Sequence, residues 1–194
     1  DIRANITLLS EGARGRLSQG FFSWQNLEGQ NPQIYAVGVK ELWETNRAPT
    51  SVIHTMGWPL GNKMFGGGFM YPMSPTLVSL GLVMGLDNHS GSFDPHYLLQ
   101  EMKTHPFYRR VLNGGSRIEW GAKTIPEGGY YSIPTKLSGN GIMVLGDSAG
   151  FVNVPTLKGI HYAMHSGILA ARTAISAIKS NDYSSSSLNQ YDDS

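Results

Sequence analysis

The chain has 194 residues, which is long enough to bury a core as one domain or as two small ones. Its 15 Lys and Arg residues against 14 Asp and Glu residues give a formal net charge of +1, so the charge balance gives no support for a nucleic-acid partner. There is no cysteine, so this chain cannot supply a disulfide, a cysteine-bound zinc or the ligands of an iron–sulfur cluster.

The first half of the chain is predicted to contain most of the strands. Residues Ile6 to Leu9 form a short apolar strand, and Leu17 to Phe22 are expected to form a short helix. β-Branched and aromatic residues then predict a strand over residues 33–43, and further strands are expected over residues 52–56 and 77–86. Between the last two, residues 64–71 contain a run of three glycines, Gly66 to Gly68. Glycine weakens a strand interior, so such a run marks either a bulged strand or a close approach by another backbone or a ligand.

Two helices and two short strands are predicted next. Asp94-Pro95 is an N-cap followed by proline at the first helical position, which predicts a helix over residues 95–103. A second helix is expected over residues 107–112, and short strands over residues 116–122 and 128–133. Ser184 to Ser187 begin a polar tail, which we interpret as a linker.

A stretch from Gly141 to His161 combines a strand, a turn, a loop and the start of a helix. Ile142 to Leu145 is an apolar run bounded by glycines, which is typical of a strand buried on both faces. Gly146-Asp147 ends this strand, and a long helix is predicted over residues 156–179. This arrangement can hold a nucleotide-like cofactor at the carboxyl end of a parallel sheet. One stripe of the helix is apolar and consists of Ile160, Met164, Ile168, Ala171, Ile175 and Ile178.

The chemistry of this stretch favours a flavin. Asp147 can accept hydrogen bonds from sugar or ribityl hydroxyls, and the free N–H groups at the helix start, with Lys158 nearby, favour a partner that becomes negative. A reduced flavin carries charge on its N1/C2=O edge and fits this description. A crossover with a Gly-Asp turn and no ligand would give the same strand–turn–helix pattern. We favour cofactor contact because this loop is more specific in sequence than a common Gly-Asp turn: it also contains Asn153, Pro155, Lys158, Gly159 and His161.

Nine short motifs follow one another along nearly the whole chain. They are EGARGRL (11–17), GVKELW (38–43), HTMGWPL (54–60), FGGGFMY (65–71), GLVMGLD (81–87), MKTHP (102–106), EGGYYSIP (127–134), GFVNVP (150–155) and KGIHYAMHSG (158–167). In this order they resemble the electron-transfer flavoprotein–ubiquinone oxidoreductase family, within the wider glutathione-reductase-like flavoprotein class.

The resemblance implies an FAD enzyme that passes electrons from reduced electron-transfer flavoprotein to ubiquinone. It implies FAD contacts by Glu11, Gly12, Gly146, Asp147, Gly150, Phe151, Asn153, Lys158 and Gly159, and quinone contacts by Phe65, Gly66 and Gly67. We assign no catalytic side chain, because electron transfer needs none, and no metal ligand. The family's location would be peripheral, on the matrix face of the mitochondrial inner membrane or the cytoplasmic face of the bacterial inner membrane. No apolar run here approaches the length of a transmembrane helix.

Several parts of the family's pattern are not found in this sequence. The Gly-x-Gly-x-x-Gly loop that carries the FAD pyrophosphate is not present, nor are the cysteines of the family's [4Fe–4S] cluster. In the family these parts and the membrane-surface segment lie outside the stretch matched here, so we expect an internal fragment of a longer protein, inactive alone. Many family members have cysteine where this chain has Asp147, which leaves the cluster content and the quinone type open.

The expected fold class is mixed α/β with two domains. Residues 1–20 and 138–180 are expected to form part of a glutathione-reductase-like FAD-binding domain, and residues 21–137 an inserted mixed-sheet quinone or substrate domain. Residues 181–194 are expected to be a linker to a missing C-terminal region. Two alternatives stay open: a related reductase or hydroxylase of the geranylgeranyl-reductase kind, and a non-catalytic module that binds no flavin.

Overall fold

The computed structural model describes residues 3–87 and 93–194, and it divides into two compact units. Unit 1 contains the chain up to Ile34 and from Pro126 onward, whereas unit 2 contains Tyr35–Ile125. These boundaries differ from those expected from the sequence, at residues 20 and 138. Residues 21–34 lie in unit 1 because the helix expected to end at Phe22 continues to Gln25, and the loop after it bonds to the segment that follows residue 126.

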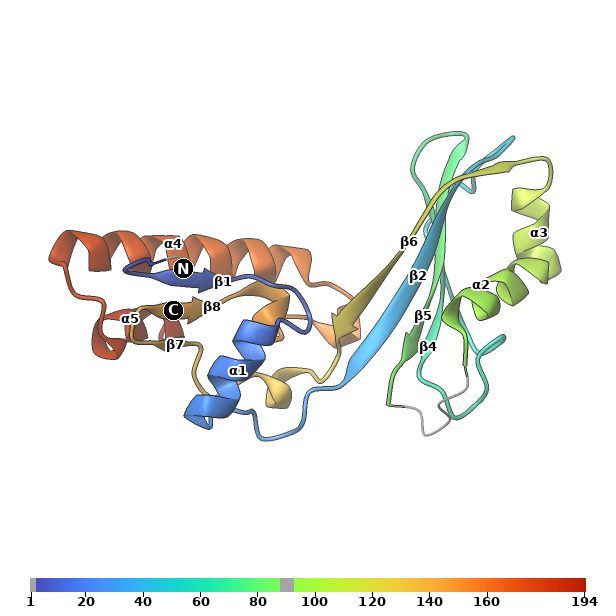
Figure 1. Ribbon diagram of the computed structural model, residues 1–194. Helices are drawn as coiled ribbons and strands as arrows, with labels where there is room; N and C mark the ends of the chain where they lie inside the picture. The colour runs from blue at the N-terminus through green and yellow to red at the C-terminus, as the bar shows by residue number, and fades with distance from the viewer. Residues whose placement is uncertain (1–2, 88–92) are drawn as a thin grey trace. The chain divides into compact units, whose positions relative to one another are not determined.

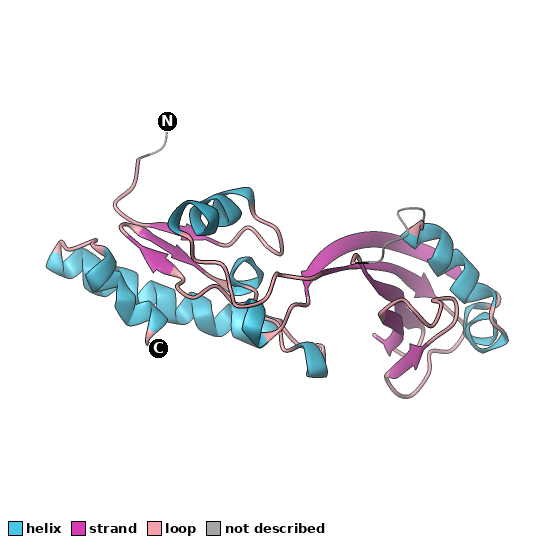
Figure 2. Ribbon diagram, turned by 90° about the horizontal axis from the view of Figure 1, so that it is seen from below, coloured by secondary structure: helices cyan, strands magenta, loops and turns pink. Residues whose placement is uncertain are grey.

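Unit 1 contains a small sheet between helices, as Figure 2 shows. The sheet order is β1-β8-β7, with β1 parallel and β7 antiparallel to β8. Helix α1 lies on one face of this sheet and α4 on the other. The bounds are β1 (Thr7–Leu9), β7 (Ser138–Gly139), β8 (Ile142–Val144), α1 (Arg16–Gln25), α4 (Ile160–Ser180) and α5 (Ser185–Asp192).

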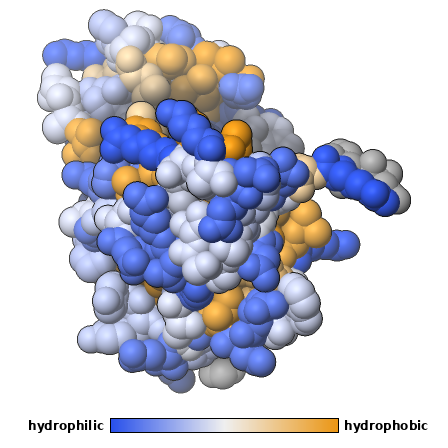
Figure 3. All heavy atoms as spheres, turned by 90° about the vertical axis from the view of Figure 1, so that its left-hand side faces the viewer, coloured by the Kyte–Doolittle hydropathy of each residue, from blue (hydrophilic) through white to orange (hydrophobic). Residues whose placement is uncertain are grey.

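The long helix of unit 1 does not pack through its apolar stripe. It begins at Ile160 and not at Thr156, because Val154–Thr156 form a short 3₁₀ turn. Its buried positions carry small side chains, which let the helix approach closely: Ser166, Ala170, Thr173 and Ala177. The predicted stripe is exposed instead, from Ile160 (80%) to Ile178 (58%). In the space-filling view of Figure 3, apolar side chains reach the surface between polar ones.

Two expectations for unit 1 are wrong. The polar tail is not a linker, because α5 forms there: Ser184 caps it, Leu188 is fully buried and Tyr191 donates a hydrogen bond to the carbonyl of Val144 at 3.0 Å. The strand expected over residues 128–133 is a glycine turn followed by the 3₁₀ helix Tyr130–Ser132.

Unit 2 is a five-stranded sheet in the order β3-β4-β5-β2-β6, with α2 and α3 lying over one face (Figure 1). Alternate residues of β5 point toward these helices, and all four of them are fully buried: Val78, Leu80, Leu82 and Met84. Leu99 and Met102 of α2 and Tyr108 and Leu112 of α3 complete this core. The bounds are β2 (Tyr35–Glu44), β3 (Ile53–Met56), β4 (Gly66–Pro72), β5 (Leu77–Gly85), β6 (Ser116–Pro126), α2 (Pro95–Thr104) and α3 (Pro106–Leu112).

Candidate functional site

The glycine run of unit 2 lies in β4, between β3 and β5. A Cβ atom at Gly66 would overlap the carbonyl oxygen of Val83 in β5, and one at Gly67 would overlap the carbonyl oxygen of Thr55 in β3. Gly66 also has a φ of +144°, which favours glycine. The sheet itself therefore requires both glycines, and quinone contact by them stays a prediction.

The third glycine, Gly68, leaves room for a buried hydrogen bond between α3 and β3. A Cβ atom at Gly68 would lie 2.6 Å from the Tyr108 hydroxyl and 2.7 Å from the Thr55 hydroxyl. These two hydroxyls share a hydrogen bond of 2.7 Å, and burial raises the pKa of Tyr108. The contact fixes α3 against the strand pair that carries the predicted quinone residues. Phe65, just before β4, keeps 55% of its surface exposed and can offer its ring to a ligand.

In unit 1 the predicted cofactor residues surround the turn that follows β8. Gly146 and Gly150 have φ values of +62° and +81°, so the chain reverses between them in a conformation that favours glycine. The N–H of Gly146 donates to the Ser166 hydroxyl of α4 at 3.1 Å, and the N–H of Phe151 donates back to the Gly146 carbonyl at 3.2 Å. The turn is thus fixed to the helix that follows it.

The structure brings Glu11 and Gly12 to the same turn. The Ser148 hydroxyl donates to the Gly12 carbonyl at 3.0 Å across 136 positions of sequence. The Glu11 carboxylate itself accepts hydrogen bonds from the N–H groups of Ser18, at 2.8 Å, and Leu17, at 3.3 Å. The Ser18 N–H lowers the pKa of Glu11. Glu11 therefore caps α1, and the Gly12 carbonyl joins this segment to the turn.

The loop from Asn153 to Gly159 delivers the chain to the start of α4. Asn153 and Lys158 form an antiparallel bridge with N–H···O distances of 2.8 and 3.1 Å, and the Lys158 residue is exposed. A Cβ atom at Gly159 would lie 3.6 Å from a carboxylate oxygen of Asp147, so the helix start and this carboxylate are neighbours. The first turn of α4 has no side-chain cap and no acidic residue.

This geometry offers two opposite kinds of hydrogen-bonding group side by side. The free N–H groups and the dipole of a 21-residue helix favour negative charge at its start. The half-buried Asp147 carboxylate is an acceptor suited to hydroxyl groups. A flavin with a ribityl chain presents both partners, an edge that becomes negative and a row of hydroxyls. The residues present therefore fit the part of FAD nearest the ring.

A buried carboxylate in unit 2 was not predicted from the sequence. Glu41 of β2 points into the core and accepts hydrogen bonds from Lys103 at 2.6 Å, Trp43 at 2.7 Å, Gln100 at 3.1 Å and Arg117 at 3.2 Å. Burial alone would raise the pKa of Glu41, but these donors, Lys103 first, lower it to about 2. The signal was present, because an acid stands at an inward position of an alternating strand.

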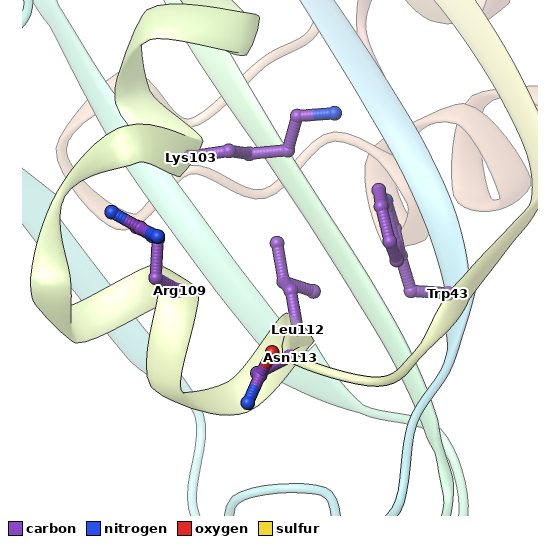
Figure 4. Close-up of a pocket in the computed structure, with 5 residues that line it drawn as sticks. All are labelled: Trp43, Lys103, Arg109, Leu112 and Asn113. Atoms are coloured by element: carbon purple, nitrogen blue, oxygen red, sulfur yellow. The ribbon is translucent and has the colours of Figure 1, made fainter.

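A small cavity opens beside this cluster (Figure 4). It has a volume of about 200 Å³ and is lined by Trp43, Lys103, Arg109, Leu112 and Asn113. The Lys103 ammonium lies over the Trp43 ring, 4.9 Å from its centroid, and is already paired with Glu41. None of these lining residues belongs to the set predicted to contact FAD or quinone.

The part of the chain that the structure describes, residues 3–87 and 93–194, holds no cluster of three or more His, Asp or Glu side chains able to bind a metal ion. Nor does any helix within it combine the length and apolarity that crossing a membrane requires.

The fold is shared with solved structures of flavin-dependent proteins and their relatives. A geranylgeranyl bacteriochlorophyll reductase-like protein from Thermoplasma acidophilum matches 98% of this chain and 46% of its own with a TM-score of 0.76, at 20% identity. A flavin-dependent brominase matches 98% of this chain and 47% of its own with a TM-score of 0.66, at 18% identity. The mixed α/β architecture is therefore that of these proteins.

Sequence comparison identifies the family. Residues 35–125, the whole of unit 2, match the family described as ETF-QO, ubiquinone-binding. The mitochondrial electron transfer flavoprotein-ubiquinone oxidoreductase of Arabidopsis thaliana is 43% identical over 92% of this chain and 29% of its own length. The human one is 41% identical over 97% of this chain and 31% of its own. The chain belongs to this family, and it spans about 30% of the length of these relatives.

Proposed function

We propose that this chain is part of an FAD-dependent oxidoreductase that passes electrons from reduced electron-transfer flavoprotein to ubiquinone. One observation carries the proposal. The compact unit at residues 35–125 coincides with the residues matched by the ubiquinone-binding family, so an independently defined structural unit and a sequence family agree. Relatives named for this reaction are 41–43% identical over nearly the whole chain.

Unit 1 is proposed as part of a glutathione-reductase-like FAD-binding domain. Bound there, FAD would supply electron transfer singly or in pairs. Asp147 would accept hydrogen bonds from the ribityl chain, and the uncapped start of α4 would stabilise negative charge on the ring edge. Gly12, Gly146 and Gly150 bring backbone close to the ligand. Phe151, Asn153, Lys158 and Gly159 hold the loop that connects the turn to the helix.

The exposed stripe of α4 supports the proposal that further polypeptide completes unit 1. Five large apolar side chains of one helix are between 48% and 80% exposed, which is a large apolar surface for one helix. The relatives are about three times longer, and the phosphate loop and any [4Fe–4S] ligands of the family are not within these 194 residues. We propose that the remaining length supplies them and covers this face.

Unit 2 is proposed as the quinone-binding domain. The exposed ring of Phe65 offers apolar contact to a quinone, and backbone groups at Gly66 and Gly67 can reach its carbonyls where no side chain intervenes. The names of the relatives support ubiquinone and electron-transfer flavoprotein as partners and a mitochondrial location. Peripheral attachment to the matrix face of the inner membrane, or to the cytoplasmic face of a bacterial membrane, belongs to the same proposal.

The reductase-like neighbour shares the fold at 20% identity, and this similarity carries no argument about the substrate of the present chain. The test is direct. The full-length protein should show flavin absorption, and a ubiquinone analogue should reoxidise the reduced flavin. Oxygen uptake driven by NADPH, with no quinone reduction, would favour a hydroxylase. A full-length protein without flavin would overturn the proposal.

A further inference from the structure

Glu127 carries a buried oxygen that lacks any partner. It opens the EGGYYSIP motif, to which no role has been given so far. Across the described residues, its Oε2 is the one buried side-chain nitrogen or oxygen that makes no hydrogen bond. Burial raises the pKa of Glu127, and no charged group contributes to that shift. A carboxylate oxygen that is buried without a donor is costly, so its burial favours the neutral acid, which has an O–H to donate.

Glu127 belongs to the same local structure as the predicted flavin turn. The N–H of the next residue, Gly128, donates to the side-chain oxygen of Gln33 at 2.7 Å. The side-chain nitrogen of Gln33 lies 2.7 Å from the position that a Cβ atom would take at Gly150. One amide side chain therefore touches both the residue after Glu127 and the end of the turn that starts at Gly146.

The backbone around Glu127 is held in place from both sides. Its own N–H donates to the carbonyl of Ile34 at 2.7 Å. The hydroxyl of Ser132 donates to the carbonyls of Gly128 and Pro32, each at 3.0 Å. A segment fixed in this way keeps Glu127 in the local structure that Gln33 links to the turn, and an apolar residue would fill the position at lower cost if packing were its only role.

We propose that Glu127 acts in its neutral form and that its O–H donates a hydrogen bond to a conjugated carbonyl oxygen of the bound redox partner. The inference rests on the proposed function. The carbonyl is that of the flavin, whose predicted turn lies in the same unit as Glu127, and a quinone carbonyl is the other outcome that the test distinguishes. Such an oxygen gains negative charge when its ring is reduced, so a neutral donor stabilises the reduced form, whereas a carboxylate would repel it.

The test is infrared spectroscopy of the full-length protein, with Glu127→Gln as the variant and Glu28→Gln, an exposed acid of the same unit, as the control. At pH 7 the wild type and Glu28→Gln should show a protonated-carboxyl C=O stretch that Glu127→Gln lacks. FAD is added to the apoprotein in one arm, and a ubiquinone analogue to the flavinated protein in the other. The arm in which the band shifts identifies which carbonyl accepts the bond.

A binding measurement completes the test. Glu127→Ala should raise the dissociation constant of the partner identified above by roughly five- to tenfold, the effect of one lost hydrogen bond, and Glu127→Gln should restore most of it by donating from its amide. Absence of the protonated band at pH 7 would overturn the inference, as would a band that neither ligand shifts. The proposed function would still stand if the flavinated wild type reduced quinone, and would fall if it held no flavin.

Discussion

The unusual residues of unit 2 are explained by contacts within that unit, whereas several features of unit 1 are not. In unit 2, the glycines of β4 are required by neighbouring strands and the buried Glu41 has four donors of its own. In unit 1, α4 exposes its apolar stripe, its first turn has no side-chain cap, and Glu127 keeps an oxygen without a partner. Unit 2 therefore satisfies its unusual residues by itself, whereas unit 1 has features that a ligand and further polypeptide would satisfy.

The largest expected effect tests whether the sheet of unit 2 itself requires the glycines of β4. Gly67→Val should destabilise the chain by about 3 kcal/mol or more, because its Cβ atom overlaps a backbone carbonyl that cannot move without distorting β3. Chemical unfolding gives the measurement, with Gly121→Val as the control, since nothing lies within 4 Å of a Cβ atom there. A stable Gly67→Val protein that only loses quinone reduction would mean that the glycine serves the ligand and not the sheet.

Acid should weaken unit 2 through Glu41. Its folded pKa of about 2 lies below the ordinary value of 4.5, so it stabilises the fold above pH 4.5 and loses that contribution as the pH falls toward 2. The loss should amount to roughly 3 kcal/mol in the free energy of unfolding. Unfolding followed between pH 5 and pH 2.5 should show this slope in the wild type and in the exposed control Glu44→Gln. A Glu41→Gln variant with the wild-type slope would assign the acid sensitivity elsewhere.

These two cases show what sequence patterns could and could not predict in unit 2. Strand and helix positions agree within a few residues, because alternation and capping are local: Asp94 caps α2 as expected, accepting from the N–H groups of His96 and Tyr97. Close approach by another backbone was one of the predicted explanations of the glycines, but a local pattern could not show which strands flank β4. Glu41 was missed because its donors lie up to 76 positions away.

In unit 1 the limits of prediction are different. The turn after β8 was predicted from its strand and Gly-Asp, but the bond from Ser148 to Gly12 joins residues 136 positions apart and no local pattern indicates it. The apolar stripe of α4 gave the wrong packing face, because the sheet accepts small residues and leaves the large ones exposed. Helix α5 was not predicted because its serine-rich composition is typical of a linker, yet its Leu188 and Tyr191 are buried.

A smaller effect is expected where unit 1 would meet its ligand. In the full-length protein, Asp147→Ala should weaken FAD binding by about tenfold through loss of a charged acceptor, and should leave the quinone KM unchanged. Flavin content after dialysis and a titration of the apoprotein with FAD measure it. A variant that keeps its full flavin content and affinity would contradict the proposed contact.

The smallest effect concerns the exposed ring beside β4. Phe65→Ala in the full-length protein should raise the KM for a ubiquinone analogue by roughly three- to fivefold through lost apolar contact, with little change in stability. Trp120→Ala, which truncates another exposed ring in the same unit, is the matched control. Equal KM values in wild type and both variants would remove Phe65 from the quinone site.

The most direct test of the account is reoxidation of reduced flavin by a ubiquinone analogue in the full-length protein, followed in the wild type, Asp147→Ala and Phe65→Ala. We predict that the wild type reoxidises rapidly, that Asp147→Ala loses flavin but keeps its quinone KM, and that Phe65→Ala keeps its flavin but needs more quinone. This separation would assign the flavin to unit 1 and the quinone to unit 2. A flavinated wild type that quinone does not reoxidise would contradict it.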